Sequence, residues 1–144
     1  ESMPFYVVDR ITEVLGLNGA AASKAWLLIL GAAFKGNVED TRHSPAIKVM
    51  ELTQGKVKKI DYHDPWVPEI HINGTRYKSV PLTAQALLRA DCVVILTDHK
   101  CFDYDFIFEH SRLILDARNA IKRRGSKKLY TLGNRPVKRM VGRT

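Results

Sequence analysis

The chain has 144 residues, of which 45% are apolar and 26% charged, a balance typical of one globular domain with a core of its own. No apolar run approaches the roughly 20 residues that a membrane span needs, and no secretory signal opens the sequence. A disordered, fibrous or membrane protein is thereby excluded. Two cysteines are too few for a disulfide framework, so we expect a reducing, cytoplasmic compartment.

The net charge of +8 belongs to the end of the chain. Residues 121–144 hold nine Lys or Arg and no acid, whereas residues 1–120 hold 14 basic and 15 acidic groups. Basic tails of this kind bind nucleic acid or anionic lipid in some proteins, but more often they are solvated ends. Because this tail has few aromatic side chains on which bases could stack, the sequence favours the solvated end.

Residues 3–17 are predicted to form a helix, since apolar residues recur there at helical spacing. Pro4 falls in the first turn, and Gly16 or Gly19 ends the helix. A short linker follows at residues 18–23. An opening helix and a linker suggest that another segment precedes them.

Downstream of the linker, apolar runs alternate with helical patterns and turn signals. Ser44 and Pro45 form a strong helix start, because serine caps free N–H groups and proline suits the first helical position. Residues 69–82 look irregular, with at most a minor hairpin at Asn73-Gly74. The other predictions are strands at 26–30, 57–62, 92–97, 113–115 and 128–132, and helices at 45–54, after a Thr83 cap and at 103–110.

This order of elements predicts an α/β fold, a Rossmann-like doubly wound parallel sheet preceded by an N-terminal helix. In such a sheet the carboxyl ends of the parallel strands share one edge, and ligands bind along it. Polar clusters follow four of the predicted strands, at residues 35–42, 63–64, 97–99 and 116–118. Their convergence predicts a ligand-binding site.

The first cluster is a charged loop between a strand and a helix start, an arrangement that binds anions. Lys35 and Arg42, with Arg118 from the fourth strand, are suited to clamp a phosphate or a diphosphate. Alternatively, Arg42 pairs with Asp40 or Asp116 and holds the loop shut. Spacing alone leaves both interpretations open.

Two nucleotide motifs come close and fail. Gly31 to Gly36 has the spacing of a P-loop, but Asn37-Val38 replaces its Lys-Ser/Thr pair, and no G-x-G-x-x-G follows a strand. The five histidines lack metal-ligand spacing with a supporting cysteine or carboxylate, so we predict no metal site. No serine or cysteine nucleophile is identifiable with a base.

Histidines stand beside carboxylates at two of the strand ends. His63 and His99, next to Asp64 and Asp98, are suited either to acid–base work or to fastening loops by hydrogen bonds, the commoner role at strand ends. Cys92 sits inside an apolar run, where a buried, inert thiol is expected.

Five segments, in order, resemble the C-terminal domain of the UDP-glucose/GDP-mannose dehydrogenase family. The first is Gly-Ala-Ala-Phe-Lys-Gly-Asn-Val-Glu-Asp-Thr-Arg-His-Ser-Pro-Ala at 31–46, and the others are at 62–68, 90–99, 102–104 and 115–119. The opening helix is similar to the end of that family's central, dimer-forming helix. The resemblance covers residues 3 to about 121, and the form of 62–68 is most similar to the UDP-N-acetylhexosamine 6-dehydrogenases.

The resemblance implies an NAD-dependent, two-step oxidation of a UDP-sugar C6 alcohol to a carboxylate, through a cysteine thiohemiacetal. The candidate sugars are UDP-N-acetylglucosamine, UDP-N-acetylmannosamine and UDP-glucose. By position, Phe34, Lys35 and Arg118 would contact the UDP-sugar, with the Lys35 ammonium near the diphosphate, and Arg42 would reach NAD bound mainly by the other domain. The resemblance implies no catalytic residue and no metal in this chain.

The family's N-terminal Rossmann domain and catalytic cysteine are absent from this sequence, and Cys92 is no substitute. We therefore expect the chain alone to be inactive and the full-length protein to be a homodimer through its central helix. The expected division is 1–22 for the helix and linker, 23–121 for the UDP-binding domain and 122–144 for the basic tail, with a last strand. The alternatives are a non-catalytic module whose tail binds nucleic acid or an acidic partner, and a pseudo-enzyme that assembles with a full-length partner.

Overall fold

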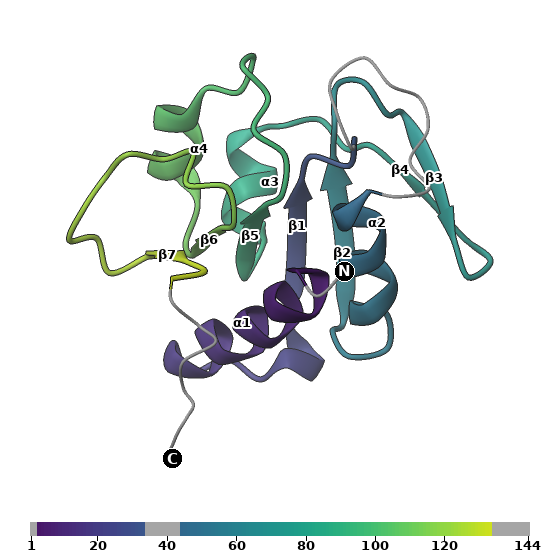
Figure 1. The fold of residues 1–144 in the computed structure, drawn as a ribbon, viewed down its shortest axis with the longest axis horizontal. Helices are drawn as coiled ribbons and strands as arrows, with labels where there is room; N and C mark the ends of the chain where they lie inside the picture. The colour runs from purple at the N-terminus through teal and green to yellow at the C-terminus, as the bar shows by residue number, and fades with distance from the viewer. Residues whose placement is uncertain (1–2, 34–43, 134–144) are drawn as a thin grey trace.

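A computed structural model describes residues 3–33 and 44–133, which form a parallel sheet with helices on both faces (Figure 1). The first half of the chain contributes α1 (Met3–Leu17), a 3₁₀ turn η1 (Ala22–Lys24), β1 (Trp26–Leu30), α2 (Pro45–Thr53) and β2 (Lys59–His63). The second half contributes β3 (Glu69–Ile72), β4 (Thr75–Lys78), α3 (Ala84–Arg89), β5 (Cys92–Ile95), α4 (Tyr104–His110), β6 (Ile114–Asp116) and β7 (Leu129–Thr131). The predicted α/β class is confirmed.

The five strands of the main sheet are all parallel and lie in the order β2-β1-β5-β6-β7. From β1 the chain moves outward to β2 and then crosses back to β5 on the other side of β1. The strand order therefore reverses between β1 and β5, and ligands of doubly wound sheets bind at the carboxyl end of this switch point.

Two hydrophobic clusters cover the two faces of the sheet. Because side chains alternate along a strand, Leu27 and Ile29 face the cluster formed with α1, α2 and the β3–β4 hairpin, whereas Leu28 and Leu30 face α3 and α4. All four side chains are at most 2% exposed. This burial on both faces explains why the strand reads as an unbroken apolar run.

Several predicted helix signals are confirmed atom by atom. In α1, the residues that recur at helical spacing form the face that packs on the sheet. Ser44 accepts a hydrogen bond from the backbone N–H of Ala46 at 3.2 Å, and Pro45 follows it at the first helical position. Thr83 and Asp103 cap α3 and α4 in the same way.

The hairpin was underestimated by the sequence analysis. Most of residues 69–82, expected to be irregular, form the antiparallel β3–β4 pair, which is joined at Asn73 and Gly74. Both turn residues have positive φ, 50° and 80°, as a tight two-residue hairpin turn requires. The predicted strand at 57–62 also begins later, at Lys59, because Lys56 and Val57 still bond back to Thr53 in a turn.

The predicted last strand forms as β7 and pairs in parallel with β6. It is also tied to α1, since the Arg10 guanidinium donates to the Thr131 carbonyl at 2.9 Å and lies 5.6 Å from the centre of the Tyr130 ring. In the part of the chain that the structure describes, no helix is both long and apolar enough to cross a membrane.

Candidate functional site

The carboxyl ends of the strands form one straight edge. Leu30, the last residue of β1, lies in register with His63 on one side and Ile95 on the other. Ile95 is in turn paired with Asp116, and Asp116 with Thr131. The predicted convergence of polar clusters is therefore confirmed for residues 63–64, 97–99 and 116–118, whereas the cluster at 35–42 lies outside the described residues.

At the switch point, Gly31, just after β1, lies very close to Thr97, just after β5. Gly31 has φ of +94°, and a Cβ atom placed there would lie 2.3 Å from the Thr97 Cβ. Only glycine fits this conformation and this contact. The Thr97 hydroxyl donates to the carbonyl of Ala33 at 3.0 Å, which fastens the two exits together.

Asp64, after β2, joins three loops of the edge. Its Oδ2 accepts the backbone N–H groups of Ala32 at 2.7 Å and Ala33 at 2.9 Å, and it lies 3.0 Å from the Nε2 of His99. Its Oδ1 accepts the N–H of Trp66 at 2.7 Å. Because an ionised carboxylate has no proton to donate, the His99 Nε2 carries the proton in this pair.

The environment of Asp64 keeps it ionised. Burial by itself would raise the pKa of this carboxyl, whose side chain is 0% exposed. The hydrogen bonds from His99 and from the amides of Ala32, Trp66 and Ala33 outweigh that effect, and the pKa lies below its ordinary value. Asp64 is thus a buried, hydrogen-bonded anion.

The two histidines fasten loops, the second of the two roles expected for them. His99 is 5% exposed and packs edge-on against Phe102, with 5.1 Å between ring centroids. The His63 Nδ1 donates to the carbonyl of Val80 at 2.7 Å. Neither geometry points to proton transfer with a ligand.

Arg118 lies at the same edge, beyond β6. Its backbone N–H and that of Ile121 bond to the two oxygens of Asp116, which is 1% exposed. Its exposed guanidinium is 3.5 Å from the carbonyl of Leu96, just past β5. Asp116 therefore shapes the loop, while the charge of Arg118 faces the solvent where an anion can reach it.

Phe34, Lys35 and Arg42 lie outside the described residues, but their neighbours in sequence are placed. The Ser44 hydroxyl donates to the carbonyl of Ala32 at 2.6 Å. The two ends of the segment 34–43 are therefore joined at the carboxyl edge, beside the switch point.

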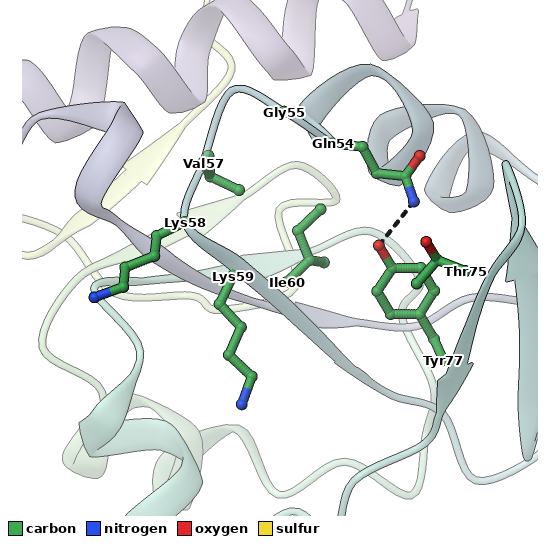
Figure 2. A pocket seen from close by; sticks show the side chains of 8 residues that line it. All are labelled: Gln54, Gly55, Val57, Lys58, Lys59, Ile60, Thr75 and Tyr77. Atoms are coloured by element: carbon green, nitrogen blue, oxygen red, sulfur yellow. Dashed lines mark hydrogen bonds between the residues drawn. The ribbon is translucent and has the colours of Figure 1, made fainter.

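Two hollows in the described surface differ in character. An open hollow of about 580 Å³ adjoins the Arg118 loop and is lined by Asn119, Ile121, Lys122, Arg123, Arg124 and Thr131, a basic set. A second, of about 360 Å³, lies at the opposite edge of the sheet, near the start of β2. Figure 2 shows Lys58 and Lys59 pointing in different directions there, away from the bonded Gln54–Tyr77 pair, so their charges do not converge.

Two further kinds of group bear on the chemistry of the chain, the thiol of Cys92 and the side chains that could bind a metal ion. Burial raises the pKa of the Cys92 thiol to about 12, as expected for an inert core cysteine. Within residues 3–33 and 44–133, no cluster of three His, Cys, Asp or Glu side chains is arranged to hold a metal ion. Because Cys92 is buried, it is no candidate nucleophile at this edge.

The sequence profile of the UDP-glucose/GDP-mannose dehydrogenase family, UDP binding domain, matches residues 28–123. The chain belongs to this family. Within that range lie Gly31, Asp64, His99 and Arg118, so the match to the family's UDP binding domain includes the ends of β1, β2, β5 and β6 but not β7. The resemblance noted in the sequence is confirmed.

The chain matches named members of the family over most of its own length. It is 34% identical to the UDP-N-acetyl-D-mannosamine dehydrogenase of Methanococcus vannielii, over 93% of this chain and 32% of that protein. It is 32% identical to the NDP-N-acetyl-D-galactosaminuronic acid dehydrogenase of Ralstonia nicotianae, over 82% and 27%. The chain spans about a third of the length of these relatives.

A solved structure of the family has the same fold. The UDP-D-ManNAc dehydrogenase of Pyrococcus horikoshii superposes with a TM-score of 0.75 and 29% identity, over 95% of this chain and 32% of that one. The match includes the N-terminal helix as well as the sheet, since it leaves only a twentieth of the chain uncovered.

Proposed function

We propose that this chain binds the UDP part of a UDP-sugar within an NAD-dependent nucleotide-sugar 6-dehydrogenase. The match of residues 28–123 to the family's UDP-binding domain carries the proposal. The edge geometry supports it, since the strand ends, the switch point and the Arg118 loop meet where ligands of doubly wound sheets bind.

Three residues are assigned to the UDP-sugar. Phe34 and Lys35 follow directly after Ala33, which is fixed at the switch point, and Arg118 approaches from the other side of β5. A lysine and an arginine on opposite sides of a diphosphate would neutralise its charge and orient it. Arg42 is assigned to NAD.

The oxidation itself requires groups that the described residues do not provide. NAD supplies the hydride acceptor, and a cysteine nucleophile is needed for the second oxidation. Cys92 is fully buried in β5, and although Cys101 is exposed, the resemblance places the catalytic cysteine upstream of the central helix. We propose that NAD and the cysteine nucleophile are supplied from outside this chain, in a homodimeric enzyme joined through the helix at residues 1–22. The division into 1–22, 23–121 and 122–144 belongs to the same proposal.

The substrate to test first follows from the relatives. The protein from Methanococcus vannielii is named a UDP-N-acetyl-D-mannosamine dehydrogenase. We therefore take UDP-N-acetylmannosamine as the first sugar nucleotide, with UDP-N-acetylglucosamine and UDP-glucose as comparisons.

Calorimetry with UDP tests the assignment of Lys35. Lys35→Ala should weaken UDP binding by about tenfold, because it removes one charge-assisted contact to the diphosphate. Lys58→Ala is the matched control, since Lys58 lies at the opposite edge of the sheet. Equal affinities for Lys35→Ala and the wild type would contradict the role of Lys35, and folded protein that binds no UDP at millimolar concentrations would contradict a self-sufficient half-site.

A further inference from the structure

The end of β1 presents two successive backbone N–H groups, those of Ala32 and Ala33, to one point. In nucleotide-binding folds, N–H groups just after a parallel strand commonly bind a phosphate. Here they converge on the Oδ2 of Asp64, at 2.7 and 2.9 Å. The anion position is thus filled by a carboxylate of the chain itself.

The same carboxylate reaches beyond β1. It holds the loop after β2 through the Trp66 N–H at 2.7 Å and the segment after β5 through His99 at 3.0 Å. With its side chain 0% exposed, these four N–H donors stand in for the water that a carboxylate would otherwise bind. Removing it would leave the buried donors of Ala32, Ala33 and His99 unsatisfied and would also release the partly buried N–H of Trp66.

The connections continue to both ends of the segment 34–43. The carbonyl of Ala33 accepts a hydrogen bond from the Thr97 hydroxyl, and the carbonyl of Ala32 accepts one from the Ser44 hydroxyl. The N–H and the C=O of both alanines are therefore engaged, and Asp64 is the partner of both N–H groups. Because Ala32 and Ala33 are already fixed in the folded chain, a ligand that binds beside them has a smaller entropic cost of ordering to overcome.

We propose that the Asp64 carboxylate is an internal anion: it binds the two N–H groups after β1 where a phosphate would otherwise bind. It thereby positions the loops at the carboxyl edge of the sheet, called here the nucleotide edge. The N–H groups of Ala32 and Ala33 are then not available to a nucleoside diphosphate bound at this edge. Asp64 is a positioning residue, with His99 as its supporting donor. The inference rests on the proposed function for the identity of the ligand, but the internal anion is testable without UDP.

Chemical rescue tests this role directly. Asp64→Ala should lower the melting temperature and weaken UDP binding by roughly tenfold or more, because it strands buried N–H donors. Formate, a carboxylate small enough to occupy the vacated space, should restore much of both, whereas chloride at equal ionic strength should not. The wild type in the same formate solution gives the baseline for any competition with UDP.

Thr53→Val is the matched destabilised control. The Thr53 hydroxyl is buried and bonds to the carbonyls of Val49 and Met50 at the other end of α2. Its removal should lower stability while leaving UDP affinity unchanged and showing no response to formate. A formate response equal to that of Asp64→Ala would contradict the internal anion.

A second pair of variants covers the case in which Asp64→Ala does not fold. His99→Gln keeps an N–H donor that can reach Asp64, whereas His99→Leu removes it. UDP affinity should stay near the wild-type value in the first and fall in the second. Equal affinities in both, or in Asp64→Ala and the wild type, would overturn the positioning role.

The outcomes separate this inference from the function on which it rests. Wild-type protein that binds no UDP would overturn the proposed function, and the melting temperature of Asp64→Ala with formate would still decide the internal anion. UDP binding with no formate rescue of either stability or affinity would contradict the internal anion while leaving the function in place.

Discussion

At the scale of single residues, the nucleotide edge is organised by carboxylates that bind backbone. Asp64 accepts N–H groups from the loops after β1 and β2, and Asp116 accepts two from the loop after β6. In both cases the carboxylate oxygens accept hydrogen bonds from the backbone, whereas the side chain of Arg118 is exposed at the same edge. Acidic residues at this edge thereby shape a site for an anion.

The lowered pKa of Asp64 predicts a specific loss of stability in acid. Because the unfolded carboxyl, near 3.8, binds protons more readily than the folded one, protonation favours unfolding. The contribution of Asp64 is complete above about pH 5 and is lost as the pH falls through the lower folded pKa. Denaturant unfolding of the wild type and Asp64→Asn, compared from neutral pH to pH 3, should show their difference shrinking in acid.

An unchanged difference between these two proteins over the whole pH range would contradict an ionised Asp64 in the fold. Glu51→Gln is a useful control, because Glu51 pairs with Lys48 on the exposed side of α2. Such surface pairs contribute little, so its effect should be small at every pH.

The sequence predicted where Asp64 and His99 lie, but not which groups they bind. The strand ends predicted that Asp64 and His99 would lie at one edge, and the bond from the Trp66 N–H two residues on is a turn that aspartate commonly makes. Periodicity assigns strands to an edge but does not say which backbone groups a side chain will meet there. The link from Asp64 to Ala32 and Ala33 depends on the packing of β1 beside β2.

At the scale of elements, the strand exits decide how closely the loops approach one another. Gly31 lets β1 leave the sheet against Thr97. The apolar run before it and the Ser44-Pro45 helix start after it were both recognisable in the sequence, and both are confirmed. The extent of the hairpin was underestimated: only a minor hairpin was expected at Asn73-Gly74, although β3 alternates exposed and buried residues before this strong turn signal.

Gly31→Ala should destabilise the domain by roughly 2 kcal/mol or more, because it combines a positive φ with an overlap against Thr97. Gly16→Ala is the matched control, since a Cβ in that helical position meets nothing within 4 Å. It should be neutral or stabilising by up to about 1 kcal/mol. Thermal unfolding of the two variants measures the contrast, and equal melting temperatures would argue against the tight crossing of β1 and β5.

At the scale of the whole molecule, the chain spans about a third of the length of the dehydrogenases that it matches. A hollow lined by basic residues adjoins the Arg118 loop at the carboxyl edge of its sheet. The two cysteines of the chain are the buried Cys92 in β5 and the exposed Cys101. The sequence pointed to the family through five segments, at 31–46, 62–68, 90–99, 102–104 and 115–119. Of the residues assigned to the ligand by resemblance, only Arg118 lies among the described residues, at the carboxyl edge. The roles of Phe34, Lys35, Arg42 and Arg118 all stay predictions.

The chain alone should not reduce NAD with any UDP-sugar. The proposed reaction needs a dinucleotide site and a cysteine nucleophile from outside this chain. Cys92 is buried in the core, and the resemblance places the catalytic cysteine upstream of the central helix rather than at the exposed Cys101. Absorbance of NADH at saturating UDP-N-acetylmannosamine is the measurement. Steady turnover that is retained in a Cys92→Ser variant and lost with Lys35→Ala would show that this chain holds a complete active site.

The most direct test of the central claim is to map UDP onto the folded chain by the change in its amide NMR signals. Binding at the carboxyl edge should shift the signals of residues 97–99 and 116–119, which follow β5 and β6. Residues 55–59, at the hollow in Figure 2, should stay unchanged. Shifts confined to residues 55–59, or no shifts at millimolar UDP, would contradict a UDP site at this edge.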